Sequence, residues 1–559
     1  MIQAQRFTFL VAIISWLVAI GASDATAIAG IPGNPGDTTA DAVLGQVDFA
    51  RGTVNFGGPR AIEQPFAVTI DSAGHLYIAD SNMSLVLGWH DVASFTNGAA
   101  ADLVIGQTDF YSYSPNHGET SGIGADTLDS PEGVAVDSNG NLYVYDSGNS
   151  RVLEYNTPFA GFDGSPITGL SANLVFGQQG SFKSSSCYSV PSISFDGLCV
   201  PYGIAVDPAG DLYVADTFNS RVLEYNTPLK VTGVPGSGDI IADLAFGPGG
   251  TLPGDVHGLG PDSLTYPRGV AVDSHGNVYI ADSWTSRVLE YNTPLEVTAV
   301  PGSGDTIADT VFGQNGSFTS AARNAGTLPG DLNGIGPDSL WNPTSVAIDS
   351  AGNVYVADLN NNRVLGYQSP LQHTATPGSG DTIADTVFGQ DGSFTKSGPD
   401  TCNDGSFPGD AVGVGPDSLC NPIGLGVDPV GNLYVGDLGT YAGSGCSGLF
   451  CGLTDRLFAN NRLLEYNAPL QVTGAPGSGD TNADLVVGQV DLFHNVTNFG
   501  GPQALWLQSG VEGAGVVIPA GLAVDPDGHL YVADPGNSRV LGWHNAASFT
   551  NGAAWMFQV

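Results

Sequence analysis

The chain has 559 residues, of which 55 are Asp or Glu and only 15 are Lys or Arg, so its formal net charge is −40. This acidity disfavours nucleic-acid partners, which need Lys and Arg against phosphate, and it disfavours anionic membrane surfaces. The apolar content of 42% excludes a disordered acidic chain, and the many glycines follow no G-X-Y period, which excludes collagen.

The first 27 residues have the pattern of a secretory signal peptide. Arg6 precedes a largely apolar run from Phe7 to Ala22, and Ala25-Thr26-Ala27 supplies a cleavage site with small residues. An uncleaved membrane anchor is the alternative, but the run is slightly short for a span. We therefore expect an exported protein, secreted, periplasmic or at the cell surface, with no membrane span after cleavage.

The remaining chain, residues 28–559, is governed by a unit that occurs seven times. Within each unit, short runs rich in Val, Leu and Tyr alternate with turns rich in Asp, Asn and Gly, which is typical of β-strands. Three such strands, followed by a segment that resembles ADLVFGQ, give four strands per unit. The sequence therefore predicts an all-β, seven-bladed β-propeller of four-stranded antiparallel blades. The units start at Pro65, Pro131, Pro201, Pro267, Pro343, Pro422 and Pro519.

The ring has one more outer-strand segment than it needs. Eight segments resemble the fourth strand, counting a degenerate one at Ala553 to Val559, whereas a closed ring of seven blades needs seven. We expect the N-terminal segment, Asp41 to Gln46, to complete the last blade and so leave no exposed strand edge. The C-terminal segment is the alternative.

The pattern P-x-G-V-A-V-D-x-x-G-N-L-Y-V-A-D-x-x-N-x-R-V resembles the NHL repeat family over Pro65 to His544. The resemblance implies a propeller that serves mostly as a binding platform, although some relatives are lyases or hydrolases. Two units depart from the pattern. The first has Leu85 in place of Arg, and the sixth has an insertion, about Leu438 to Phe458, between its Asp and its Arg.

Most acidic residues are expected to be framework. The Asp that ends each first strand can accept turn N–H groups, and an Asp–Arg pair five residues apart is expected to pin the next turn. The Tyr of the N-L-Y-V segment is interpreted as a packing residue. The predicted pairs are Asp146/Arg151, Asp216/Arg221, Asp282/Arg287, Asp358/Arg363 and Asp534/Arg539.

The six cysteines fall into three local pairs, which we predict to be disulfides because the protein is expected to be exported. They are Cys187/Cys199, Cys402/Cys420 and Cys446/Cys451. No resident cofactor is expected. Ca²⁺ is an alternative for a recurring G-D-x-x-G-x-G-P-D-S-L motif, in which two carboxylates flank a Gly-rich loop. Its aspartates are Asp255/Asp262, Asp331/Asp338 and Asp410/Asp417.

Strand counting assigns the loops to two faces. The links into each first strand and the turns between second and third strands share one face, here called the upper face, and all three cysteine pairs fall there. Repeats differ most on this face, at the residue after each unit's Pro and in the turn before N-x-R. Aromatic rings with charged neighbours are typical of peptide or glycan sites. The predicted ligand-binding patch comprises Glu132, Tyr202, Phe218, Arg268 and Trp284.

These patterns favour a monomeric, non-catalytic binding scaffold for a protein or carbohydrate ligand. Two alternatives remain open. One is a metal-assisted lyase or lactone hydrolase, with polar side chains from several blades converging at the channel. The other is a structural cell-surface protein, in which substitutions in the upper-face patch would have no effect on binding. No G-x-S-x-G, phosphate-loop or H-E-x-x-H motif occurs.

Overall fold

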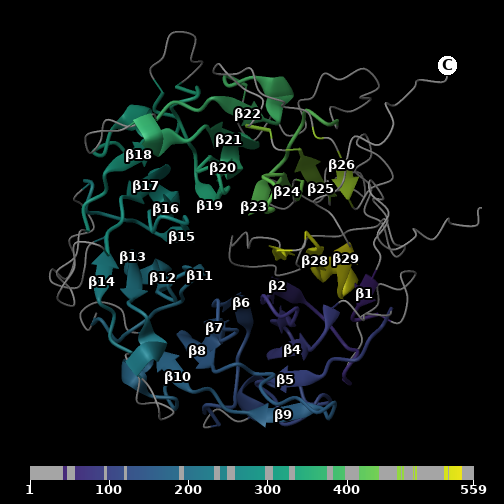
Figure 1. Ribbon diagram of the computed structural model, residues 1–559. Coiled ribbons are helices and arrows are strands. Elements are labelled where there is room, and N and C mark those ends of the chain that lie inside the picture. Colours follow the sequence, from purple (N-terminus) through teal and green to yellow (C-terminus); the bar gives the residue numbers. More distant parts are fainter. Residues whose placement is uncertain are drawn as a thin grey trace, which may run out of the picture.

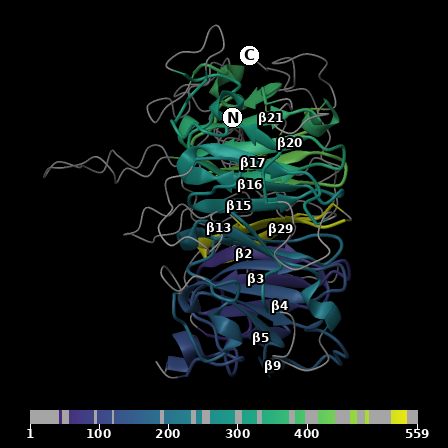
Figure 2. The ribbon, with the colours of Figure 1, turned by 90° about the vertical axis from the view of Figure 1, so that its left-hand side faces the viewer.

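The protein is described by a computed structural model that covers most of the repeated units (Figures 1 and 2). The described residues are 42–46, 57–92, 97–118, 122–187, 194–231, 240–247, 259–295, 306–326, 334–373, 382–396, 415–439, 462–467, 469–470, 483, 485–487, 521–526 and 528–543. The predicted signal peptide and the segment 553–559 lie outside them. Within the described part, no helix combines the length and apolar character that a membrane crossing requires.

Seven sheets are arranged in a ring, as the repeat predicts (Figure 1). The first strand of each unit contacts the first strand of the units before and after it, and β27 (Leu522–Val524) contacts β2 (Pro65–Ile70), so the first strands form the inner wall of a closed ring. Blades one to seven are numbered here by their units. The fold is an all-β seven-bladed propeller of small antiparallel sheets.

Blades one to three follow the predicted strand order from the channel outward. Blade one contains β2, β3 (Leu76–Asp80), β4 (Leu85–Trp89) and β5 (Leu103–Ile105). Blade two contains β6 (Pro131–Val136), β7 (Leu142–Asp146), β8 (Arg151–Tyr155) and β10 (Leu174–Phe176). Blade three contains β11 (Ile204–Val206), β12 (Leu212–Asp216), β13 (Arg221–Tyr225) and β14 (Leu244–Phe246).

Blades four to six repeat this order. Blade four contains β15 (Pro267–Val272), β16 (Val278–Asp282), β17 (Arg287–Tyr291) and β18 (Thr310–Phe312). Blade five contains β19 (Pro343–Ile348), β20 (Val354–Asp358), β21 (Arg363–Tyr367) and β22 (Thr386–Phe388). Blade six contains β23 (Pro422–Val427), β24 (Leu433–Asp437), β25 (Arg462–Tyr466) and β26 (Leu485–Val487).

Blade seven is completed by the N-terminal segment, which confirms the preferred prediction for ring closure. It contains β27, β28 (Leu530–Asp534) and β29 (Arg539–Trp543), and β1 (Ala42–Leu44) pairs antiparallel with β29. In Figure 1 the purple β1 lies beside the yellow β29. Residues far apart in the chain therefore share one sheet, and loss of β1 would expose the edge of β29.

Two features go beyond the predicted four strands. A fifth strand, β9 (Ile167–Leu170), comes from the link between β8 and β10 and pairs parallel with β5 of blade one. Short 3-10 helices form many of the turns and links. They are Pro115–Gly118, Ser147–Asn149, Gln178–Gly180, Thr217–Asn219, Pro228–Val231, Ser283–Thr285, Gln314–Gly316, Leu359–Asn361, Pro370–His373, Gln390–Gly392 and Pro535–Asn537.

The core lies between neighbouring blades. Val and Leu side chains of the second and third strands are buried, and the Phe of a fourth strand meets the Tyr that ends the third strand of the next blade. Phe312 and Tyr367 have ring centroids 4.8 Å apart in an edge-to-face arrangement, and the same pair recurs at three more blade junctions. These pairs stabilise the contact between blades beyond the effect of apolar burial.

Candidate functional site

The two predicted loop faces are supported by hydrogen bonds between loops. On the upper face, the backbone N–H of Trp284, between β16 and β17, donates to the carbonyl of Thr265 in the link into β15 (3.3 Å). The Thr217 hydroxyl of blade three donates to the carbonyl of Pro267 in blade four (2.6 Å). On the opposite face, the N–H of Thr157 after β8 donates to Asn141 Oδ1 in the turn before β7 (3.1 Å).

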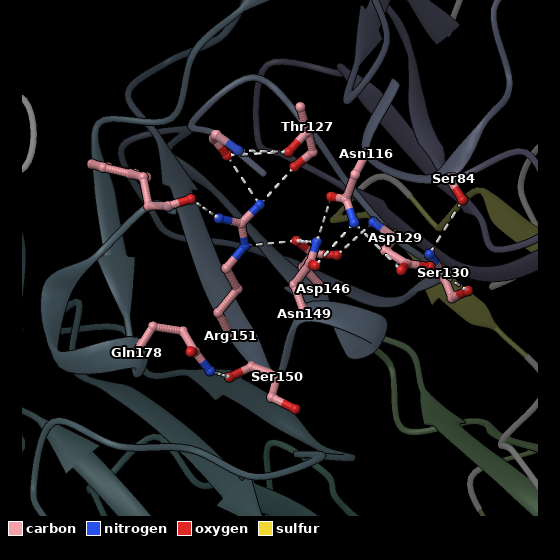
Figure 3. Close-up of polar contacts among 12 residues, drawn as sticks. Ser84, Asn116, Thr127, Asp129, Ser130, Asp146, Asn149, Ser150, Arg151 and Gln178 are labelled. Carbon is pink, nitrogen blue, oxygen red and sulfur yellow. Dashed lines mark hydrogen bonds and ion pairs between the residues drawn. The ribbon is translucent and has the colours of Figure 1, made fainter. Parts of the chain in front are cut away.

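The Asp–Arg pair is a buried anchor for these upper-face loops, as Figure 3 shows for blade two. Arg151 Nε lies 2.7 Å from Asp146 Oδ2, and both side chains are fully buried. The other guanidinium nitrogens donate to the carbonyls of Phe182, Gly124 and Thr127, at 2.8 to 3.0 Å. One side chain therefore ties the turn between β7 and β8 to two links, which is a structural role.

This ion pair recurs in six blades, at Nε–Oδ2 distances of 2.7 to 2.9 Å. In blade six, Asp437 pairs with Arg462 across the insertion. Blade one is the exception, because Leu85 stands in the Arg position and Asp80 accepts only backbone N–H groups there, from Glu63, Gln64 and Met83. Burial raises the pKa of Asp80 to about 6, against the lowering effect of these N–H donors.

The other repeated polar residues also have framework positions. The Asp that ends each first strand accepts N–H groups of its own turn, as Asp137 does from Asn139 and Asn141 at 2.9 Å. The Tyr of the second strand is buried in every blade. These tyrosines are Tyr77, Tyr143, Tyr213, Tyr279, Tyr355, Tyr434 and Tyr531. The predictions for both positions are confirmed.

One predicted disulfide lies within the described residues. Cys187 and Cys199 are bonded, with a Cα–Cα distance of 4.3 Å, in the link into blade three. Cys420 is buried and disulfide-bonded. Cys402, Cys446 and Cys451 lie outside the described residues, so the pairs Cys402/Cys420 and Cys446/Cys451 stay predictions.

The G-P-D-S-L loops are held by internal hydrogen bonds. In blade five, Gly336 N–H donates to Ser339 Oγ (2.9 Å), and Arg363 donates to the Ser339 carbonyl (2.8 Å). Asp262 is exposed, whereas Asp338 and Asp417 are buried. Asp255, Asp331 and Asp410 lie outside the described residues. Among those described, no group of three or more His, Cys, Asp or Glu residues is placed to hold a metal ion.

Three of the five predicted ligand-binding residues lie on the upper face, where the charges of Glu132 and Arg268 both act on Tyr202. Glu132, Tyr202 and Arg268 follow the first-strand Pro in blades two, three and four, and all three are half-buried. Burial raises the pKa of Tyr202, and the charge of Glu132 raises it further while that of Arg268 opposes the rise. Burial also raises the pKa of Glu132 to about 7, and a hydrogen bond from Ser147 opposes this rise. We call these three residues the polar trio.

The two remaining predicted residues belong to a row of exposed aromatic rings. Phe218 is 49% exposed and Trp284 is 72% exposed, and Tyr266 lies between them. The ring centroid of Tyr266 is 5.5 Å from that of Phe218 and 5.5 Å from that of Trp284. We call Phe218, Tyr266 and Trp284 the aromatic row. Because Tyr266 precedes Arg268 by two residues, the row runs close to the polar trio at the junction of blades three and four.

Sequence reasoning missed Tyr266, although a signal for it exists. The residue before the first-strand Pro has positive φ in five blades, at Ser130, Val200, Tyr266, Asn342 and Asn421. Asn tolerates this left-handed backbone, whereas a bulky aromatic residue there is unusual. A Tyr at that position of the repeat is therefore a departure that could have been noticed. The nearby pair of Arg323 and Trp341 was also missed; the guanidinium carbon lies 4.8 Å from the indole centroid.

Comparisons with known proteins agree with the repeat. The NHL repeat family matches residues 128–155, 198–225, 264–291, 340–367 and 517–543. A comparison with curated protein sequences found no match. Three solved structures that resemble the chain are 9–12% identical to it, and at TM-scores of 0.41–0.42 they support no inference about its activity.

The first is a streptogramin B lyase structure, with 9% identity and a TM-score of 0.42; the match covers 88% of this chain and 95% of that one. The second is virginiamycin B lyase from Staphylococcus aureus, with 10% identity and a TM-score of 0.42; the match covers 88% of this chain and 97% of that one. The third is Kuenenia stuttgartiensis hydrazine synthase, with 12% identity and a TM-score of 0.41; the match covers 87% of this chain and 96% of that one. The closed ring of seven sheets and the matched repeats together identify the chain as an NHL repeat-containing β-propeller protein.

Proposed function

We propose that this propeller is exported and acts as a monomeric scaffold that captures a protein or carbohydrate ligand on its upper face. One observation carries the proposal: three exposed aromatic rings form a row in which Tyr266 contacts both others, and this row shares the upper face with three half-buried polar side chains. Exposed apolar groups that cluster in this way, with a polar rim, are typical of interaction sites.

The framework residues support the assignment to this face. The buried Asp–Arg pairs anchor the links and turns from which the aromatic row emerges, and the Cys187–Cys199 bond constrains the link that leads to Tyr202. Loops that are fixed in this way lose little conformational freedom on binding, which favours affinity. The acidic net charge disfavours nucleic acid as the ligand.

A binding assay with matched variants tests the proposal. The purified protein is screened against soluble polysaccharides and extracellular proteins, and Trp284→Ala and Phe218→Ala are compared with Tyr111→Ala. Tyr111 is a suitable control because it is 70% exposed and outside the aromatic row. We expect the first two variants to weaken capture at least tenfold, in line with an aromatic anchor residue worth about 2 kcal/mol, and the control to bind normally.

Three results would contradict or redirect the proposal. Equal losses in all three variants would show that the row has no special role, and unchanged binding in all three would favour the structural surface protein. Chemical conversion of the ligand during the incubation would instead identify an enzyme. Export is tested separately, since the mature protein is expected to lack residues 1–27 by mass spectrometry.

A further inference from the structure

Arg268 differs from the six arginines of the buried ion pairs. It is half-buried, and burial lowers its pKa, yet among the described residues no carboxylate lies within 4.0 Å of its guanidinium. The Tyr202 side chain opposes this lowering of the Arg268 pKa, but its own pKa is raised, so at neutral pH it carries no charge to pair with the guanidinium. A partly desolvated guanidinium without a carboxylate is unfavourable in the free protein, and its planar donors match an incoming carboxylate.

The backbone around Arg268 fits closely between the neighbouring blades. A Cβ on Gly203 of blade three would lie 2.3 Å from the Arg268 carbonyl oxygen, and one on Gly269 would lie 2.8 Å from that of Thr344 in blade five. The positions of Tyr202, Arg268 and Thr344 therefore follow one another at the upper end of the inner wall. The Thr344 hydroxyl is buried and makes no hydrogen bond among the described residues.

The aromatic row supplies a surface of a different kind, and its central residue, Tyr266, precedes Arg268 by two residues in the chain. Its rings are inclined by 59° between Phe218 and Tyr266 and by 34° between Tyr266 and Trp284, so they form a row of neighbouring tilted rings. Such a row favours a ligand made of successive ring-shaped units, of which sugars and nucleobases are the common kinds. The charge of −40 repels the dense phosphates of nucleic acid far more than a short sugar acid.

We propose that the ligand is an acidic oligosaccharide, whose sugar rings lie on Phe218, Tyr266 and Trp284 and whose uronic-acid carboxylate pairs with Arg268. This inference rests on the proposed upper-face function and specifies its ligand class. Because the protein is strongly acidic, a short chain with few carboxylates is favoured over a long polyanion at low salt. At physiological salt, charges beyond about 8 Å are largely screened, and the contact at Arg268 dominates.

The test compares each acid with its own methyl ester. The probes are trisaccharides of galacturonate, mannuronate and glucuronate and their methyl esters, titrated into the full protein by calorimetry at 0.15 M salt. The ester keeps the sugar ring but removes the charge. We expect at least one acid to bind about tenfold or more tightly than its ester, as a charge-assisted hydrogen-bonded pair allows.

Two variants distinguish the acidic-sugar inference from the proposed binding function on which it rests. Arg268→Gln is expected to abolish the preference for the acid while leaving the binding of the ester unchanged, whereas Trp284→Ala should weaken both. Arg60→Gln, at an exposed site, is the control and should behave as the wild type. Melting temperatures equal to that of the wild type would show that each variant is folded.

The outcomes are distinguishable. If no acid binds better than its ester, or if Arg268→Gln keeps the preference, the acidic-sugar inference is wrong. In that case the upper-face scaffold still stands if Trp284→Ala weakens capture of some other ligand. If the protein prefers an aromatic peptide acid over its amide and binds no sugar, the assignment of a sugar ligand is wrong, and the pairing of a ligand carboxylate with Arg268 stands. If Trp284→Ala affects no ligand at all, the proposed function itself fails.

Discussion

Replacement of Arg151 by Leu is the most direct test of the buried ion pair, because blade one already carries Leu at this position. In Arg151→Leu, Asp146 loses the guanidinium and keeps hydrogen bonds from the Asp129 N–H and the Asn149 amide, while three carbonyls lose their donor. Removing one partner of a buried pair typically costs about 3–5 kcal/mol.

Asp80 of blade one indicates the size of this cost. In the absence of an arginine, burial raises its pKa from 3.8 to about 6, which corresponds to about 3 kcal/mol against the charged form. Asp146 in the variant has fewer N–H donors than Asp80, so its penalty should be at least as large. A folded-state pKa above the unfolded value means that this penalty is absent below pH 4 and complete above pH 6.

The assay is urea unfolding followed by tryptophan fluorescence at pH 5 and pH 8, with the exposed Arg60→Leu as a control. We expect Arg151→Leu to lower the free energy of unfolding by about 3 kcal/mol at pH 8, and by less at pH 5, where more of the Asp146 carboxyl is protonated. A loss below 1 kcal/mol, or an equal loss at both pH values, would refute the reasoning.

Three further predictions concern other sites. Leu85→Arg should lower the pKa of Asp80 and reduce its contribution to the loss of stability between pH 4 and pH 6; an unchanged pH profile would mean that the new guanidinium does not reach it. The double variant Cys187→Ala/Cys199→Ala should be less stable by about 2–3 kcal/mol and lose part of its sensitivity to reductant. Tyr266→Asn should keep or raise the unfolding midpoint, because Asn tolerates positive φ, and yet weaken ligand capture; equal binding would exclude Tyr266 from the site.

Calcium is tested by chelation. Because the described parts of the G-P-D-S-L loops are closed by their own serine and arginine hydrogen bonds, we expect EDTA to leave the unfolding midpoint unchanged. An increase in the midpoint on adding Ca²⁺ to the chelated protein would instead support the alternative that the motif binds this ion.

The fold was predictable because the same sequence pattern of strands and turns occurs seven times. Strand alternation, turn residues and the fourth-strand segments predict the blades. The count of outer strands left the N-terminal and the C-terminal segment as candidates to close the ring, and the preferred N-terminal one, β1, does so. The strand β9 was not predictable, because its pairing with β5 depends on where the preceding link lies in space. The sequence placed the insertion of blade six between its Asp and its Arg, but the five-residue spacing of the other pairs does not apply across it, and the ion pair of Asp437 with Arg462 follows from the register of β24 and β25.

The candidate site was predictable only in part, and the reason lies in how its members are related in the chain. Phe218 and Trp284 occupy equivalent positions of neighbouring units, so comparing the repeats brings them together. Tyr266 belongs to a different position of the repeat, so a comparison of equivalent positions does not place its ring beside those of Phe218 and Trp284. Comparing units detects variation at one position, but not contacts between different positions.

Framework and recognition thus occupy separate positions of the same unit. The repeated Asp, Arg and Tyr residues are buried with partners inside their own blade or its neighbour, so a substitution there disturbs the fold. The residue after the first-strand Pro differs from blade to blade: it is buried at Phe66, Thr344 and Ile423, and half-buried at Glu132, Tyr202 and Arg268. A ring built in this way can acquire a new ligand by changing Glu132, Tyr202 or Arg268 without altering any anchor. The left-handed backbone at this position carries Ser, Val or Asn in other blades, so the framework does not require the bulky ring of Tyr266, and we attribute that ring to recognition.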